Sequence, residues 1–257
     1  MRQPPGVQSG DPGPRPIAAI AAAGATLQAS TRDEYLQAAD LRDFVERKRH
    51  KLHHPETAYY VSQALEECAV AREPGRDEDL PADERRAAST LARHCSGFQG
   101  DVIDPARILE LLRYAALWGE PHAQARLLLL RDVAAPKDDA LPDLPWMLAL
   151  REPSIVRDVG AFLSRGEAER RYGDDRVPTA VAAIAWELAA CDLDRSCVPE
   201  SRFALAQCAS LGRCSDWRYE DAVARFEPPE LMEPALRLRE GILRALRERD
   251  WEWLGLG

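Results

Sequence analysis

Six cysteines are the residues whose type and spacing most directly suggest chemistry in this chain of 257 residues. They are Cys68, Cys95, Cys191, Cys197, Cys208 and Cys214. Paired thiols can oxidise to disulfides, which persist in oxidising compartments, or they can bind a metal ion as thiolates. The count is even, and the first two cysteines fall on consecutive predicted helices. The sequence therefore favours three disulfides, of which the first joins these two.

The last four cysteines form two C-x5-C pairs joined by ten residues. Of the three connectivities that four cysteines allow, we favour bonds that cross between predicted helices, Cys191 to Cys208 and Cys197 to Cys214. Two alternatives stay open. One is free buried thiols, which are common core residues of cytosolic helical proteins. The other is a zinc site, although zinc ribbons usually place two residues, not five, between paired thiolates.

The sequence holds no local signature of a catalytic or phosphate-binding site. It lacks a glycine-rich phosphate loop, G-x-S-x-G, H-E-x-x-H and an EF-hand pattern. His50, His53 and His54 lie close together but have no carboxylate ligand in register. We therefore expect no catalytic residue, no cofactor and no metal ion. A site assembled from distant carboxylates or histidines leaves no such signature, so a helical enzyme stays an alternative. A metal-binding regulator that uses the C-terminal cysteine cluster is another.

The elements that must position these residues are helices. Alanine, leucine, arginine and glutamate dominate, aromatic residues make up 7% of the chain, and β-branched residues form no long alternating run. Many of the 19 prolines stand where helices would begin or end. These patterns predict an all-α protein of about ten helices in antiparallel hairpins, with almost no sheet.

Apolar periodicity and capping residues predict the helix bounds. We expect helices at about 31–52, from 55, 82–95, 105–118, 120–133, 153–165, 177–191, 199–212, 217–225 and 229–249. Four consecutive leucines at 127–130 predict a helix that is buried on most sides. We expect the apolar tail from Trp251 to Gly257 to fold back onto the core, and Trp118, Trp146 and Trp186 to lie in it.

Composition suggests two regions. Residues 1–30 begin with a proline- and glycine-rich stretch that predicts a disordered leader, and the alanine-rich residues 17–29 are an alternative signal-like segment. Residues 31–257 form the predicted helical domain, with a possible internal boundary at 134–145. Disulfides and a signal segment would together place the protein in the periplasm or outside the cell, and a cytoplasmic location is the alternative.

The overall charge and hydropathy exclude some partners. The formal charge of −9 disfavours nucleic-acid binding, which depends on cationic groups that neutralise phosphates. No run approaches the length of a membrane-spanning helix, so we expect no transmembrane segment. The oligomeric state is not specified by the sequence.

The segment around Gly119 predicts two helices that meet at a tight turn. Gly119 can adopt the left-handed conformation that ends the first helix. The small side chains of Ala115, Ala116 and Ala123 would let the two helix backbones approach closely.

With Gln124 and Leu127, these residues form the pattern Ala-Ala-x-x-Gly-x-x-x-Ala-Gln-x-x-Leu, which resembles the most recognisable part of a Sel1-like repeat. Such repeats are relatives of the tetratricopeptide repeats. The resemblance covers residues 104–130, and no second copy follows at a regular period.

The resemblance implies stacked helix pairs in a right-handed superhelix, with an irregular helical bundle as the alternative. It also implies a non-enzymatic scaffold of a bacterial type that binds a protein or peptide in a groove between hairpins. The motif positions concern packing, so we expect residues near the Gly119 turn to shape the groove without contacting the ligand.

Overall fold

The computed structural model describes residues 30–71, 80–130, 142–165, 168–194, 197–215 and 218–257. The predicted leader, the signal-like segment and most of the predicted boundary at 134–145 lie outside these residues. The described part of the chain contains twelve α-helices and one two-stranded hairpin. The predicted all-α class is therefore confirmed.

The N-terminal half of the chain forms six α-helices and two short 3-10 helices. They are α1 (Thr31–Gln37), α2 (Leu41–Lys48), η1 (Arg49–Lys51), α3 (Pro55–Ala71), α4 (Ala82–His94), η2 (Ser96–Phe98), α5 (Pro105–Leu117) and α6 (Pro121–Leu130).

The C-terminal half adds the remaining elements. They are α7 (Leu144–Ala149), α8 (Pro153–Leu163), β1 (Glu169–Tyr172), β2 (Asp175–Pro178), α9 (Thr179–Leu193), α10 (Arg202–Leu211), α11 (Tyr219–Phe226) and α12 (Pro229–Glu248). The antiparallel strands β1 and β2 pair Tyr172 with Asp175, which leaves a two-residue turn.

Several boundaries differ from the predicted ones. The single helix expected at 31–52 is wrong, because α1 ends at Gln37 and a new helix, α2, starts after Asp40. Asp40 caps α2 by accepting hydrogen bonds from the backbone N–H groups of Arg42 and Asp43. The short helix α7 and the β1–β2 hairpin were not predicted. The four leucines of α6 are not buried on most sides, since only Leu128 is fully buried and Leu130 is exposed.

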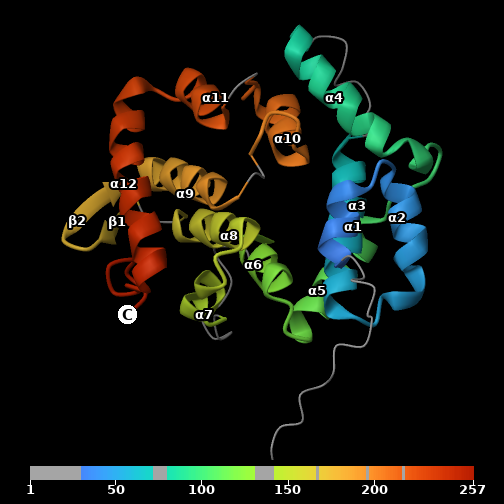
Figure 1. Cartoon of the computed structure of the whole chain (residues 1–257), viewed down its shortest axis with the longest axis horizontal. Coiled ribbons are helices and arrows are strands. Elements are labelled where there is room, and N and C mark those ends of the chain that lie inside the picture. The colour runs from blue at the N-terminus through green and yellow to red at the C-terminus, as the bar shows by residue number, and fades with distance from the viewer. Residues whose placement is uncertain (1–29, 72–79, 131–141, 166–167, 195–196, 216–217) are drawn as a thin grey trace, which may run out of the picture.

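The helices form an arc that returns on itself (Figure 1). The blue and cyan helices of the N-terminal half lie on one side, the orange and red helices of the C-terminal half on the other, and α6 connects them. The arc closes because α10 packs against α4. A solenoid repeat contacts only its neighbours, whereas α4 and α10 are distant in the sequence. Because this long-range contact is not typical of a solenoid, the predicted superhelix is not confirmed.

Among the residues that the structure describes, the hydrophobic core has two large clusters and a small one. The buried residues of the first cluster lie between Ala38 and Ala123, and those of the second lie between Ala125 and Leu254. Helix α6 therefore contributes buried residues to both clusters. The small cluster joins α4 to α10 through Ala87, Leu91, Cys208 and Ala209. The two halves therefore meet at α6 on one side and at the α4–α10 contact on the other.

Trp186 is fully buried in the core, as predicted. Its indole N–H donates to the Tyr172 hydroxyl at 2.8 Å, which fixes the hairpin on the core. Trp118 and Trp146 are 64% and 47% exposed, so their predicted place in the core is wrong. Both stand near helix ends where the core does not extend.

The C-terminal tail folds back, as predicted. Leu254 is fully buried, and the carbonyl of Trp253 accepts a hydrogen bond from the Gly173 N–H at 2.9 Å. The Trp253 ring also lies against Gly241, where a Cβ atom would stand 2.5 Å from it. Gly241 thus leaves room in α12 for the tail.

The predicted turn at Gly119 is present. Gly119 has a φ of 85°, in the left-handed region, while Ala115 and Ala123 are fully buried. The Gln124 side-chain amide donates to the carbonyl of Ala116 at 3.2 Å, which also accepts from the backbone N–H of Gly119 at 3.1 Å, so Gln124 adds a second hydrogen bond at the end of α5. Each of these motif residues thus has a packing or capping role.

Three disulfides are present, but the favoured C-terminal connectivity is wrong. Cys68 bonds to Cys95, as predicted, whereas Cys191 bonds to Cys197 and Cys208 to Cys214. Each C-terminal bond joins a helix to the loop that follows it, because the chain turns back within six residues. No free cysteine occurs in the described residues, so the free-thiol and zinc alternatives do not hold for this oxidised state.

Candidate functional site

A cleft of about 750 Å³ lies between the two halves of the molecule. Its walls come from α1, α3 and α4 on one side and from α6, α8 and α10 on the other. We refer to this space as the central cleft. Its volume falls in the range of ligand-binding pockets, and sites of this kind favour the junction between packed units.

Helix periodicity explains which residues of α8 reach the central cleft. Ile155, Val156 and Val159 are fully buried in the second core cluster. They fix the orientation of α8, so the positions one turn apart on another face, 153, 154, 157 and 158, line the cleft.

The opposite wall is formed mainly by α3, which is held by the first core cluster and by the Cys68–Cys95 bond. It contributes three kinds of groups to the lining. They are the aromatic rings of Tyr59 and Tyr60, the carboxylates of Glu66 and Glu67, and the side chains of Gln63, Val70 and Ala71. Aromatic and arginine side chains are the ones that contribute most to binding in protein interfaces.

Most charged groups in the central cleft are paired. Arg126 on α6 forms an ion pair with Glu66 at 2.5 Å, and Arg202 on α10 lies 3.5 Å from Glu67. The Tyr35 hydroxyl also donates to Glu67, at 2.9 Å. The two ion pairs connect the N-terminal wall to the C-terminal wall across the cleft.

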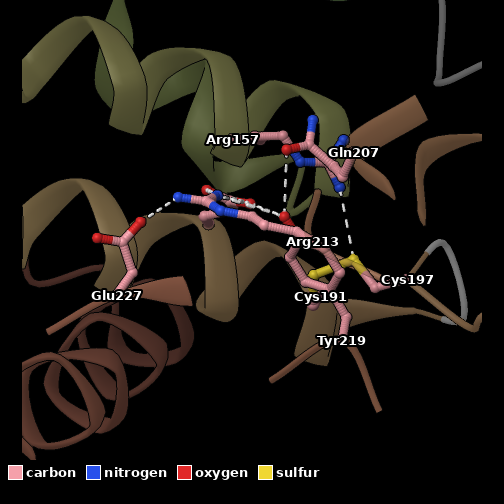
Figure 2. Close-up of polar contacts among 8 residues, drawn as sticks. Arg157, Cys191, Cys197, Gln207, Arg213, Tyr219 and Glu227 are labelled. Carbon is pink, nitrogen blue, oxygen red and sulfur yellow. Dashed lines mark hydrogen bonds and ion pairs between the residues drawn. A yellow bond between two sulfur atoms is a disulfide. The ribbon is translucent and has the colours of Figure 1, made fainter. Parts of the chain in front are cut away.

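Arg157 and Asp158 are different. In the described part of the chain no carboxylate lies within 4.0 Å of the Arg157 guanidinium, and the Asp158 carboxylate forms no hydrogen bond or ion pair. The guanidinium instead lies 3.6 Å from the centre of the Phe203 ring. It also lies 3.7 Å from the Cys197 sulfur (Figure 2). These contacts hold the guanidinium in place without neutralising it.

Desolvation favours the neutral form of both groups, so it raises the pKa of Asp158 and lowers the pKa of Arg157. Burial raises the pKa of Asp158 to about 6, against the opposing effect of Arg126 and Arg157. Burial also lowers the pKa of Arg157, although Asp158 and Glu187 act in the other direction. Both charges are therefore held in the cleft at a cost.

The pKa values of two tyrosines in the cleft walls are also raised. Burial, followed by the nearby Asp158 carboxylate, raises the pKa of Tyr59 well above its usual value. For Tyr35 the causes are burial and then Glu67. Both phenols are thus neutral hydrogen-bonding groups over the physiological range.

Buried polar atoms without a hydrogen-bond partner are concentrated in residues that line this cleft. Among the described residues there are seven such side-chain atoms. Four belong to lining residues: Glu67 Oε1, His94 Nδ1, Arg126 Nε and Arg157 Nε. Folded proteins satisfy most buried polar groups, and each exception calls for an explanation such as strain, a functional role or a bound water or ion.

A network of ion pairs and hydrogen bonds holds the helices of the C-terminal wall together. Arg213 pairs with Glu187 at 3.0 Å and with Glu227, and the Tyr219 hydroxyl donates to Glu187 (Figure 2). The Gln207 amide lies 3.2 Å from the same hydroxyl, which positions this lining residue. The network connects α9, α10 and α11.

The residues that the sequence singled out lie outside the central cleft. None of the six cysteines and none of the six turn residues from Ala115 to Leu127 is among its lining residues. Three cysteines, Cys197, Cys208 and Cys214, line a smaller hollow of about 530 Å³ next to α4 and α10. Within the described residues no group of three metal-binding side chains occurs. None of the described helices could cross a bilayer.

Sequence reasoning missed Arg157, Asp158 and the charged residues that face them. One signal was present: α8 carries consecutive charges inside an otherwise apolar helix. No model of a protein family, no curated protein and no solved structure matches this chain. The case for this site therefore rests on its geometry and charge.

Proposed function

We propose that this protein is a non-enzymatic binding protein whose central cleft receives a peptide segment of a partner. The observation that carries the proposal is the set of buried polar atoms in the cleft walls that have no partner within the described residues. A bound peptide offers N–H and C=O groups that could satisfy them. The aromatic rings and aliphatic side chains of the same walls would contact its side chains.

The Gly119 turn supports a related proposal about ancestry. Its left-handed glycine, its buried alanines and its Gln124 cap agree with a divergent Sel1-like helix pair. Such pairs are typical of adaptors that bind other proteins. Three disulfides further support a location in the periplasm or outside the cell.

A selection from a random peptide library tests the binding function. We expect the wild-type protein to enrich a set of related peptides. Replacing Ala206, which lines the cleft on α10, by tryptophan fills part of the space and should weaken these peptides at least about tenfold. Ala224→Trp is the matched control, since Ala224 is exposed on α11 and lines neither hollow.

The exposed cleft residue Ser210 gives a second variant that places less strain on folding. Ser210→Trp should also weaken binding, and circular dichroism of all three variants shows whether they fold. Failure to enrich any peptide, or equal affinity of wild type and both cleft variants, would contradict the proposal.

A second candidate function is acid–base catalysis by a helical enzyme, and the raised pKa of Asp158 in a cleft is the observation that favours it. A carboxyl group with a pKa of about 6 can act as a general acid or base near neutral pH. Hydrolysis of chromogenic esters or glycosides that Asp158→Asn abolishes would support this function. We favour binding because no second acid–base group stands in hydrogen-bond contact with Asp158 among the described residues.

A further inference from the structure

Among the described residues, two desolvated charges in the central cleft have no ion-pair partner, and the other unpaired lining charge, Glu200, is exposed to solvent. Arg32 pairs with Glu152 at 2.8 Å, and Arg126 and Arg202 pair with carboxylates of α3. Arg157 and Asp158 have no such pair among the described residues. They are adjacent on α8 and both line the cleft.

An unpaired desolvated charge is unfavourable, and a bound group of opposite charge removes the penalty. The Arg157 side chain stacks on Phe203, which fixes the plane of its guanidinium, and its buried Nε has no hydrogen-bond acceptor. A carboxylate accepts two parallel hydrogen bonds from such a group. An anionic ligand group is therefore the chemical complement of Arg157.

Asp158 is the corresponding group for a positively charged part of the ligand. The groups that face it from the neighbouring helices are Arg126 and His122 on α6 and Glu66 and Tyr59 on α3. Arg126 already pairs with Glu66, so Asp158 has no ion pair of its own, although Arg126 and Arg157 lie near it, and it stands next to aromatic rings. A carboxylate beside Tyr59 and Tyr60 suits an ammonium or guanidinium group, which also interacts favourably with the faces of aromatic rings.

We propose that the central cleft selects ligands that carry both a negative and a positive group, with Arg157 binding the negative group and Asp158 the positive one. This inference rests on the proposed binding function and specifies its ligand class. In a peptide, the two groups are an acidic and a basic side chain or the charged termini.

The test uses short random peptides with acetylated and amidated ends as the probe. The wild-type protein should enrich peptides that contain both an acidic and a basic residue. Hydrogen bonds to charged groups contribute roughly 1.5–3 kcal/mol, so Arg157→Gln or Asp158→Asn should weaken the enriched peptides at least about tenfold.

Neutral peptide analogues separate the two roles. Changing the acidic residue of the peptide to its amide should weaken binding to wild type but not further weaken binding to Arg157→Gln. Neutralising the basic residue should behave in the same way with Asp158→Asn. The matched controls Arg237→Gln and Glu248→Gln change exposed charges on α12 and should leave binding unchanged. Free termini added to the same peptides show whether terminal charges can replace the side chains.

Thermal melting of both cleft variants shows that they fold. Enrichment of peptides without a charge preference would overturn this inference and leave the binding function standing. Enrichment of no peptide would overturn both. Equal losses for charged and neutral peptides in either variant would show that Arg157 or Asp158 acts only on the shape of the cleft.

Discussion

At the scale of single residues, Asp158 shows that the cleft holds charge at a cost to stability. Its pKa is about 6 in the folded protein, above the ordinary value of 3.8. The folded state therefore binds more protons than the unfolded state between these two pH values. Stability is highest below pH 3.8 with respect to this group, and it falls as the pH rises through about 6.

Because ionisation of Asp158 lowers the stability of the folded protein, removing its charge in Asp158→Asn should raise the stability at high pH. At pH 8 the variant should be more stable than wild type by about 2 kcal/mol, after allowance for the partial solvent exposure of the site. At pH 4 the difference should nearly vanish, because the wild-type carboxyl is then neutral. Urea unfolding at both pH values measures the effect, with Glu248→Gln as an exposed control. A loss of stability at pH 8 would show that the carboxylate has a favourable partner.

At the scale of elements, α12 and the tail that follows it depend on one glycine. A Cβ atom at Gly241 would stand 2.5 Å from the Trp253 ring. We expect Gly241→Ala to destabilise the protein by roughly 1–3 kcal/mol, as overpacking does, despite the better helix propensity of alanine.

The destabilisation by Gly241→Ala should depend on the Trp253 side chain of the C-terminal tail. In a Trp253→Ala background the Gly241→Ala change should be neutral or stabilising, since nothing then occupies the space. Thermal unfolding of the two single variants and the double variant measures this coupling. Equal destabilisation in both backgrounds would contradict the described packing.

Local signals in the sequence predicted most of the helices. Pro55 begins α3, Asp104 caps α5, and the Gly119 turn ends it with a left-handed residue. The break before α2 was missed because Asp40 also accepts a hydrogen bond from the backbone of Gly97, 57 residues away. Such tertiary contacts leave no local pattern.

The β1–β2 hairpin had a signal that was overlooked. Gly173 and Asp174 form a two-residue turn, a pair that favours tight hairpins. The strands are polar, so alternation did not reveal them, and the burial of Tyr172 under Trp186 holds them in place.

The central cleft was beyond prediction because its walls are assembled from helices far apart in the sequence. Arg202 on α10 reaches Glu67 on α3 across a separation of 135 residues. Neither residue carries a motif. Only the packing of α10 against α4 brings them together.

At the scale of the whole molecule, the three disulfides should contribute unequally. The Cys68–Cys95 bond closes 27 residues, whereas each C-terminal bond closes 6. From the loss of chain entropy in the unfolded state, removal of the Cys68–Cys95 bond should cost about 3.5 kcal/mol, against about 2 kcal/mol for either short bond. Denaturant unfolding of the paired cysteine-to-alanine variants ranks them.

Thiol alkylation without reductant provides the control for that series. The wild-type protein purified from an oxidising compartment should not react, because its described cysteines are all bonded. Reaction of all six thiols would contradict the disulfides and the proposed location. Equal losses for the long and short bonds would contradict the entropic explanation.

The central claim is that the cleft between the two halves binds peptide, and hydrogen–deuterium exchange with an enriched peptide tests it most directly. The account predicts slower exchange in α3, α8 and α10, which form the cleft walls, and unchanged exchange in α2 and α12, which do not line it. Protection confined to α2 or α12, with none in the walls, would contradict it.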